Sequence, residues 1–331
     1  MKKIRLVGIF MMAILLTIAA VACGQQQTTS LKVAEVTRSI FYAPQYVALE
    51  KGFFEEEGLD VELNTTWGGD KTMTALLSDG TDIALVGSET SIYVHARGAN
   101  DPAVNFAQLT QTDGTFLVAR EEVKDFQWED LNDSTFLGQR KGGMPQMVGE
   151  FVLKKHGIDP QKNLNLIQNV DYANIPNAFA SGTGDYVQLF EPTASIFEQE
   201  GIGHIVASFG EESGHVPYTV FMAKESFIKE NEEAIKKFTK AIYKAQQWVE
   251  AQPAMETAKV IQPYFEDSEL DLIATVVDRY KSQGSFATDP ILDEEEWNNL
   301  KVIMEEAGEL PEDVDHSTLV NTSIAEEIIS E

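Results

Sequence analysis

Cysteine is almost absent from this sequence of 331 residues, which contains a single one at position 23. Disulfide frameworks and multi-cysteine metal sites need several cysteines, so both are excluded. The five histidines are scattered along the chain and lack the short spacings of zinc ligands. Neither a G-x-S-x-G elbow nor a phosphate-binding loop ending in Gly-Lys-Ser/Thr occurs. We therefore expect no metal, no cofactor and no enzymatic activity.

Basic residues are also scarce, with 25 Lys and Arg against 53 Asp and Glu and a formal net charge of −28. A surface this acidic repels phosphate backbones, and no basic stripe offsets it, so we expect no nucleic-acid partner. Residues 291–331 hold 13 acidic residues against one lysine. We interpret this segment as a solvated helical tail that keeps an exported protein soluble.

One long apolar run begins the chain and follows a short basic head. It extends from Leu6 to Ala22, a little less than the roughly 18–20 residues that span a bilayer as a helix. The run ends on small residues directly before Cys23, as in a cleaved signal peptide. This junction resembles a bacterial lipobox, although the usual leucine is replaced by Ala20.

We predict that residues 1–22 are a lipoprotein signal peptide, that Cys23 is lipidated and that residues 23–30 form a flexible tether. The protein would then be extracytoplasmic and bound to the bacterial cell membrane through its lipid anchor only. The alternative is an ordinary signal peptide with an incidental cysteine.

The rest of the chain alternates between strand and helix patterns. Its 43% hydrophobic and 24% charged residues are typical of a globular protein, and its length suggests two domains. Strands are predicted at 31–36, 59–63, 81–86, 105–109, 116–119, 135–138, 164–168, 186–190, 205–207 and 219–223. Helices are predicted at 44–51, at 71–78 after a capping Asp70, at 89–97 after a capping Ser88, and at 144–155, 175–180 and 192–200. Repeated β–α units predict helices on both faces of largely parallel sheets.

Only helical patterns follow Asn231. Apolar residues recur at three- and four-residue spacing over 234–249, which predicts a strongly amphipathic helix. Further helices are predicted at 254–264, 269–282 and 294–307.

Residues 44–63, PQYVALEKGFFEEEGLDVEL, resemble the opening of substrate-binding proteins of ABC importers. The resemblance is to the NMT1/THI5-like and SsuA-like branch, which includes thiamin-pyrimidine, sulfonate and nitrate binding proteins. It extends through 76–89 and resumes at Glu191-Pro192 and at 218–223. It implies a type II periplasmic-binding-protein fold, in which two α/β lobes are joined by two crossing strands. Lobe 1 would comprise 31–114 and 220–331, with the C-terminal helices packed on it, and lobe 2 would comprise 115–219.

Loops at the carboxyl ends of parallel strands face the cleft between such lobes, so residues that follow the strands are candidates for ligand binding. The candidates are Arg38, Ser39, Tyr42, Trp67, Gly68, Ser88, Glu89, Gln111, Gly143, Met144, Glu191 and Tyr218. The aromatic side chains among them could stack on a flat ring. Each also has an ordinary structural interpretation: Tyr42 could start a helix, Trp67 could pack, and Glu191 could favour a helix dipole.

Two of the candidates, Glu89 and Glu191, are carboxylates that would be costly to bury beside an anion. A carboxylate suits an aminopyrimidine, because it accepts from the exocyclic amine and can keep a ring nitrogen protonated. Arg38 and the turn at 140–143 favour an anion instead.

The sequence thus predicts a monomeric solute-binding lipoprotein that delivers a small molecule, such as a thiamin-precursor pyrimidine, to an ABC permease with a cytoplasmic ATPase. The alternatives are a binder of alkanesulfonate, taurine or nitrate, or a surface lipoprotein without a transport role. A pyrimidine synthase with the same fold is recognised by a CCCFC run, and this chain has no cysteine after Cys23.

Overall fold

The computed structural model describes residues 28–331. The predicted signal peptide, Cys23 and most of the tether lie outside the described residues. No helix within residues 28–331 is long and apolar enough to cross a membrane.

The first of two sheets has five strands in the order β2-β1-β3-β10-β4. Strand β1 (Thr29–Glu35) is parallel to β2 (Leu59–Thr65) and to β3 (Ile83–Gly87). Strand β10 (Thr219–Lys224) is antiparallel to both β3 and β4 (Ala103–Thr110). Every residue of β4 is buried, as expected for a strand covered on both faces.

The second sheet also has five strands, in the order β7-β6-β8-β5-β9. Strand β6 (Thr135–Leu137) is parallel to β7 (Asn165–Ile167) and β8 (Tyr186–Phe190), whereas β5 (Thr115–Ala119) is antiparallel to β8 and to β9 (His204–Ser208).

Half of the strand pairings are therefore antiparallel, and the prediction of largely parallel sheets was wrong. The reason is that β10 returns from the second sheet and enters the first one between β3 and β4. Strand β5 occupies the corresponding place in the second sheet, between β8 and β9.

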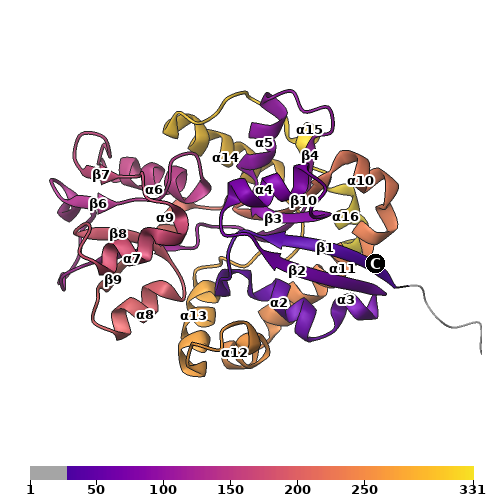
Figure 1. Ribbon diagram of the computed structural model, residues 1–331, viewed down its shortest axis with the longest axis horizontal. Coiled ribbons are helices and arrows are strands. Elements are labelled where there is room, and N and C mark those ends of the chain that lie inside the picture. The colour runs from indigo at the N-terminus through magenta and orange to yellow at the C-terminus, as the bar shows by residue number, and fades with distance from the viewer. Residues whose placement is uncertain (1–27) are drawn as a thin grey trace, which may run out of the picture.

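Fifteen α-helices and four short 3-10 helices are found within residues 28–331. Around the first sheet are η1 (Ile40–Tyr42), α2 (Ala43–Glu50), α3 (Phe53–Glu56), α4 (Gly69–Leu77), α5 (Glu89–Ala96), α10 (Glu225–Glu230), α11 (Glu232–Ala251), α12 (Ala254–Ile261), η4 (Gln262–Tyr264), α15 (His316–Leu319) and α16 (Ser323–Ser330). Around the second are η2 (Trp128–Leu131), α6 (Met144–Lys155), η3 (Tyr172–Asn174), α7 (Ile175–Ala180), α8 (Thr193–Gln199) and α9 (Phe209–Ser213). Helices α13 (Leu270–Ser282) and α14 (Glu294–Ala307) lie beside the junction of the two sheets, below and above it in Figure 1.

We call each sheet with its surrounding helices a lobe, the first and the second. The lobe boundaries at 114/115 and 219/220 stay a prediction. Figure 1 shows the second lobe to the left of the first, with the connecting segments between them. The outgoing segment follows β4, and the return segment passes through α9. The two segments are hydrogen-bonded to each other, because Val216 N donates to Gln111 O at 3.0 Å and Tyr218 N donates to Thr110 O at 3.1 Å.

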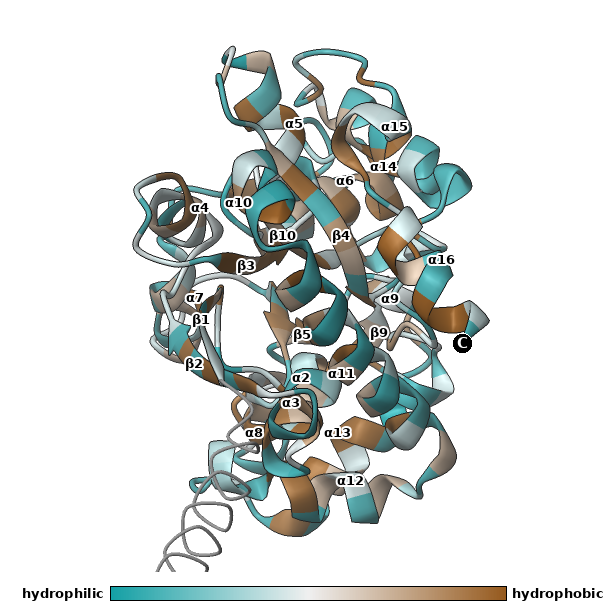
Figure 2. Cartoon of the chain, turned by 90° about the vertical axis from the view of Figure 1, so that its right-hand side faces the viewer, coloured by the Kyte–Doolittle hydropathy of each residue, from teal (hydrophilic) through white to brown (hydrophobic). Residues whose placement is uncertain are grey.

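The acidic C-terminal segment is not a solvated tail, so that interpretation was wrong. It forms three helices, and Trp297 of α14 is completely buried. Helix α16 packs on α11 and buries Ile324, Ala325 and Ile328. The acidic residues of this segment lie on the outer faces of helices whose apolar faces are covered. Helix α11 has the same arrangement, and its outward side is mainly hydrophilic in Figure 2.

Candidate ligand-binding site

A cavity of about 380 Å³ lies between the two lobes. The first lobe contributes the starts of α4 and α5, and the second contributes the loop after β6, the start of α6 and the end of β8. Chain segments that follow parallel strands meet at this edge, as in other open α/β sheets. The volume lies within the range of about 300–1,000 Å³ that is usual for small-molecule sites.

Six of the residues nominated from the sequence line this cavity. They are Tyr42, Gly68, Glu89, Gly143, Met144 and Tyr218. Whether they contact a ligand stays a prediction.

Four other nominees have partners within the protein and do not line the cavity. Arg38 pairs with the buried Glu35 at 2.9 Å, and Ser39 Oγ donates to the carbonyl of Glu191 at 2.8 Å. Ser88 occupies the N-cap position of α5, as predicted, but its hydroxyl donates to the carbonyl of Pro217 instead of capping the helix. Gln111 Nε2 donates to the carbonyl of Gly284 at 3.0 Å.

The last two nominees also lie outside the cavity lining. Glu191 is buried, and its carboxylate is paired with Arg279 and accepts from Ser195 N at 2.9 Å. Trp67 is 49% exposed and has a left-handed backbone conformation with φ of 59°. The side chain of Glu191 could not be placed from sequence alone, because its partner lies on a helix 88 residues away.

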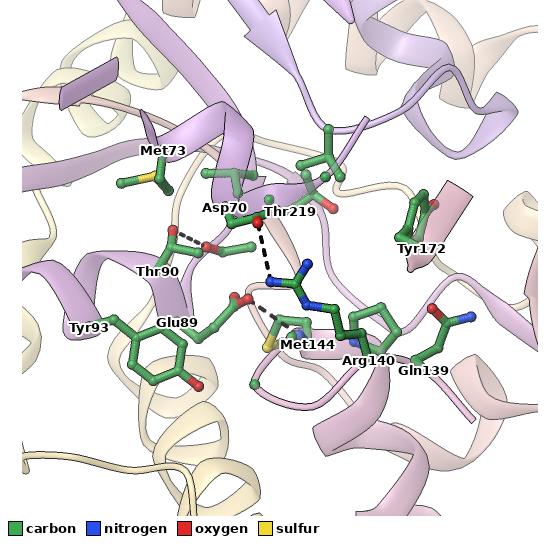
Figure 3. A pocket seen from close by; sticks show the side chains of 18 of the residues that line it. Asp70, Met73, Glu89, Thr90, Tyr93, Gln139, Arg140, Met144, Tyr172 and Thr219 are labelled. Atoms are coloured by element: carbon green, nitrogen blue, oxygen red, sulfur yellow. Dashed lines mark hydrogen bonds and ion pairs between the residues drawn. The ribbon is translucent and has the colours of Figure 1, made fainter. Parts of the chain in front are cut away.

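Glu89 is the one carboxylate buried in the cavity among the residues described. Its side chain belongs to the first residue of α5, and the residue is 4% exposed. Oε1 accepts from the backbone N of Met144 in the second lobe at 3.3 Å, whereas Oε2 is buried and has no hydrogen-bond partner (Figure 3). Burial raises the pKa of Glu89 to about 8. A Cβ at position 87 would overlap with Oε2, so Gly87 is needed for this placement.

Aromatic rings form the walls around Glu89. Tyr42 belongs to the first lobe, Tyr218 directly precedes β10 in the return segment, and Tyr172 and Phe190 belong to the second lobe. The rings of Tyr172 and Phe190 lie 6.3 Å apart between centroids, and those of Phe190 and Tyr218 lie 6.5 Å apart. The hydroxyl of Tyr218 is buried without a hydrogen-bond partner, and burial raises its pKa well above the ordinary value. Such walls suit a flat ring that carries polar groups.

Charged residues lie at the mouth of the cavity. Arg140 from the second lobe pairs with Asp70 from the first at 3.1 Å, as Figure 3 shows. Lys141 pairs with Glu309 at 3.4 Å. The predicted capping role of Asp70 was wrong: Gly68 is the N-cap of α4, no side chain caps it, and the Asp70 carboxylate reaches across the cleft instead.

Sequence reasoning missed several lining residues. They include Asp70, Met73, Thr74, Leu77, Thr90, Tyr93, Val94, Arg97, Gln139, Tyr172, Phe190 and Thr219. The lining residues on α4 and α5 recur every three or four residues, and this spacing in the sequence indicates that they share one face of each helix. The sequence does not show that both faces border one cavity.

Within residues 28–331 no three or more His, Cys, Asp or Glu side chains are grouped so that they could hold a metal ion.

Comparison with known proteins gives three kinds of likeness. The model of the NMT1-like family matches residues 24–262. The chain is 66% identical over 320 residues to YtlA of Bacillus subtilis (strain 168), itself only provisionally named a binding protein, and the match covers 96% of each protein.

Solved structures share the fold at low identity. The ligand-binding component of an ABC-type import system from Staphylococcus aureus is 13% identical with a TM-score of 0.73, covering 91% of this chain and 99% of that one. The alkanesulfonate-binding protein SsuA from Xanthomonas axonopodis pv. citri is 14% identical with a TM-score of 0.70, covering 90% and 99%. The nitrate-binding protein NrtA from Synechocystis PCC 6803 is 18% identical with a TM-score of 0.70, covering 92% and 89%. The predicted periplasmic-binding-protein fold is confirmed.

Proposed function

The chain belongs to the NMT1-like family, and from this premise we propose that it is the solute-binding component of an ABC importer. It captures a small molecule between its lobes and presents the closed form to a permease that is driven by a cytoplasmic ATPase. The cavity carries this proposal, because both lobes contribute to it and it contains a buried carboxylate with a free oxygen.

The ligand in this proposal is a heteroaromatic amine such as a thiamin-precursor pyrimidine. Glu89 holds one proton in the empty site at neutral pH, because burial raises its pKa to about 8. Oε2, which has no partner, can donate this proton to a ring nitrogen, while Oε1 can accept from the exocyclic amine in addition to Met144 N. The ring would stack between Tyr42, Tyr172 and their aromatic neighbours.

The main alternative is an anion such as an alkanesulfonate or nitrate, as named for two of the similar structures. Arg140 and Lys141 beside the start of α6 favour it. The contacts of these two cations argue against it, because both already have carboxylate partners.

The location is part of the same proposal. Cleavage before Cys23 and lipidation of its thiol would keep a monomeric protein at the outer face of the cell membrane, close to its permease. Release of a Cys23→Ser variant from the membrane fraction would support this anchor, and unchanged membrane association would contradict it.

The ligand is tested by direct identification and by titration. Mass spectrometry of the denatured protein identifies what it carries from the cell. In calorimetric titrations we expect 4-amino-5-aminomethyl-2-methylpyrimidine to bind, and taurine and nitrate not to bind. A charge-assisted hydrogen bond contributes about 1.5–3 kcal/mol, so Glu89→Gln is expected to weaken binding by about tenfold or more.

Glu55→Gln is the matched control, because Glu55 is an exposed carboxylate of α3 far from the cavity lining. Saturable binding of taurine or nitrate that Glu89→Gln leaves intact or improves would contradict the proposed ligand.

A further inference from the structure

The lining of the cavity extends from Glu89 along α4 and α5, and we call this part of the lining the arm. Helix α4 contributes Met73 and Leu77 to this arm, and α5 contributes Tyr93, Val94 and Arg97. Their spacing of three and four residues puts them on one face of each helix. Figure 3 shows Thr90 between Met73 and Tyr93.

Glu89 is the first residue of α5 and Arg97 is its C-cap. Eight residues at about 1.5 Å of helical rise separate their backbone positions by about 12 Å along the helix axis. Between the ends the walls are mainly apolar. Leu77 is 43% exposed, so the far end of the arm is open to solvent.

Arg97 differs from the other cations that line the cavity. Arg140 and Lys141 have carboxylate partners, whereas the Arg97 guanidinium has no hydrogen bond or ion pair within residues 28–331. Arg97 is exposed, so its guanidinium is open to water and none of the described acidic residues pairs with it. A guanidinium presents two parallel N–H donors to a carboxylate or phosphate.

The geometry points to a bipartite ligand, whose amine-bearing ring binds Glu89 and whose apolar middle part leads along α4 and α5 to an anionic group held by Arg97. This inference rests on the proposed function and narrows its ligand class. A single ring satisfies Glu89 alone, whereas a ligand with an anionic end about 12 Å away satisfies both ends of the cavity.

Titration with three compounds tests the bipartite ligand separately from the proposed function on which it rests. Thiamin and thiamin monophosphate share an aminopyrimidine and a middle ring and differ in one phosphate, and 4-amino-5-aminomethyl-2-methylpyrimidine is the ring alone. In calorimetric titrations of the intact mature protein, we expect thiamin monophosphate to bind at least about tenfold more tightly than thiamin.

Variants of Arg97 test whether this residue causes the difference in affinity between thiamin monophosphate and thiamin. Arg97→Gln is expected to lower the ratio of the affinities for thiamin monophosphate and thiamin to about one, and Arg97→Lys is expected to restore part of that ratio. Lys124→Gln is the matched control, because it removes one positive charge from an exposed residue that does not line the cavity.

The outcomes are distinguishable. Binding of the single ring without any gain from the phosphate, or an equal loss for all compounds in Arg97→Gln, overturns the bipartite ligand and leaves the proposed function intact. Failure of all three compounds to bind overturns the proposed ligand class and this inference with it.

Discussion

Glu89 joins the two lobes and also leaves one oxygen free for a ligand. Its Oε1 accepts from Met144 N across the cleft, and the free Oε2 fits only because residue 87 has no side chain. A buried polar atom without a partner costs free energy unless something binds it, so this oxygen is where ligand binding gains most.

The pH dependence of stability tests the burial of Glu89. The unfolded carboxyl titrates near 4.5 and the folded one near 8. Below pH 4.5 Glu89 is protonated in both the folded and the unfolded state, and its contribution to the free energy of unfolding is highest. Between these values the unfolded chain has lost a proton that the folded chain retains, so the free energy of unfolding falls as pH rises, and the loss is complete above about pH 8.

We expect the melting temperature of Glu89→Gln to rise relative to the wild type between pH 5 and pH 8, measured without ligand at several pH values. Other buried acids, such as Asp113 and Glu296, titrate in both proteins, so only the difference is diagnostic. A difference that stays constant over this range would show that Glu89 is ionised throughout.

At the scale of elements, one ion pair connects the turn between β8 and α8 of the second lobe to α13. The carboxylate of Glu191 is completely buried and pairs with Arg279, whose guanidinium also lies 5.2 Å from the ring centre of Phe116. Ser195 donates to the same carboxylate through its backbone N and its hydroxyl. This carboxylate, a candidate ligand contact from the sequence, is placed by the structure in a contact between the turn after β8 and helix α13.

Removing the cation should leave a buried charge unpaired. We expect Arg279→Met to lower the free energy of unfolding by about 3 kcal/mol at pH 7, measured by urea denaturation. Burial raises the pKa of Glu191, and the loss of Arg279 would raise it further. The penalty should therefore shrink as pH falls and Glu191 takes up a proton. The double variant Glu191→Gln with Arg279→Met should lose this pH dependence, and an unchanged dependence would contradict the pairing.

At the scale of the whole molecule, contacts across the cleft close the two lobes over the cavity. Arg140 pairs with Asp70, and the Tyr93 hydroxyl lies 3.6 Å from Met147 Sδ of α6. A ligand that binds the closed form better than the open form shifts the population toward closure.

Closure can be measured by energy transfer between one dye on each lobe. Cys23 is the only native cysteine, so a Cys23→Ser protein with Glu55→Cys and Lys124→Cys is labelled at these two exposed sites alone. We expect a saturating ligand to change the transfer efficiency, and we expect Glu89→Gln to need a higher ligand concentration for the same change. The same efficiency with and without ligand would argue against hinge closure.

Much of the local structure was readable from the sequence. The predicted bounds of α6, α7, α14 and β8 match the observed ones. Periodic apolar positions and turn residues are local properties, and they report which stretch is a helix or a strand without knowledge of its neighbours. The family resemblance supplied the two-lobed fold.

The tertiary structure alone decided which elements pair and which side chains meet. Strand direction depended on where β10 and β5 enter their sheets, and the burial of α16 depended on its packing on α11. Glu89 and Glu191 both follow strands, yet one faces a cavity and the other an arginine 88 residues away. Periodicity determines the face of an element, whereas burial and charge pairing depend on residues that are distant in the chain and close only after folding.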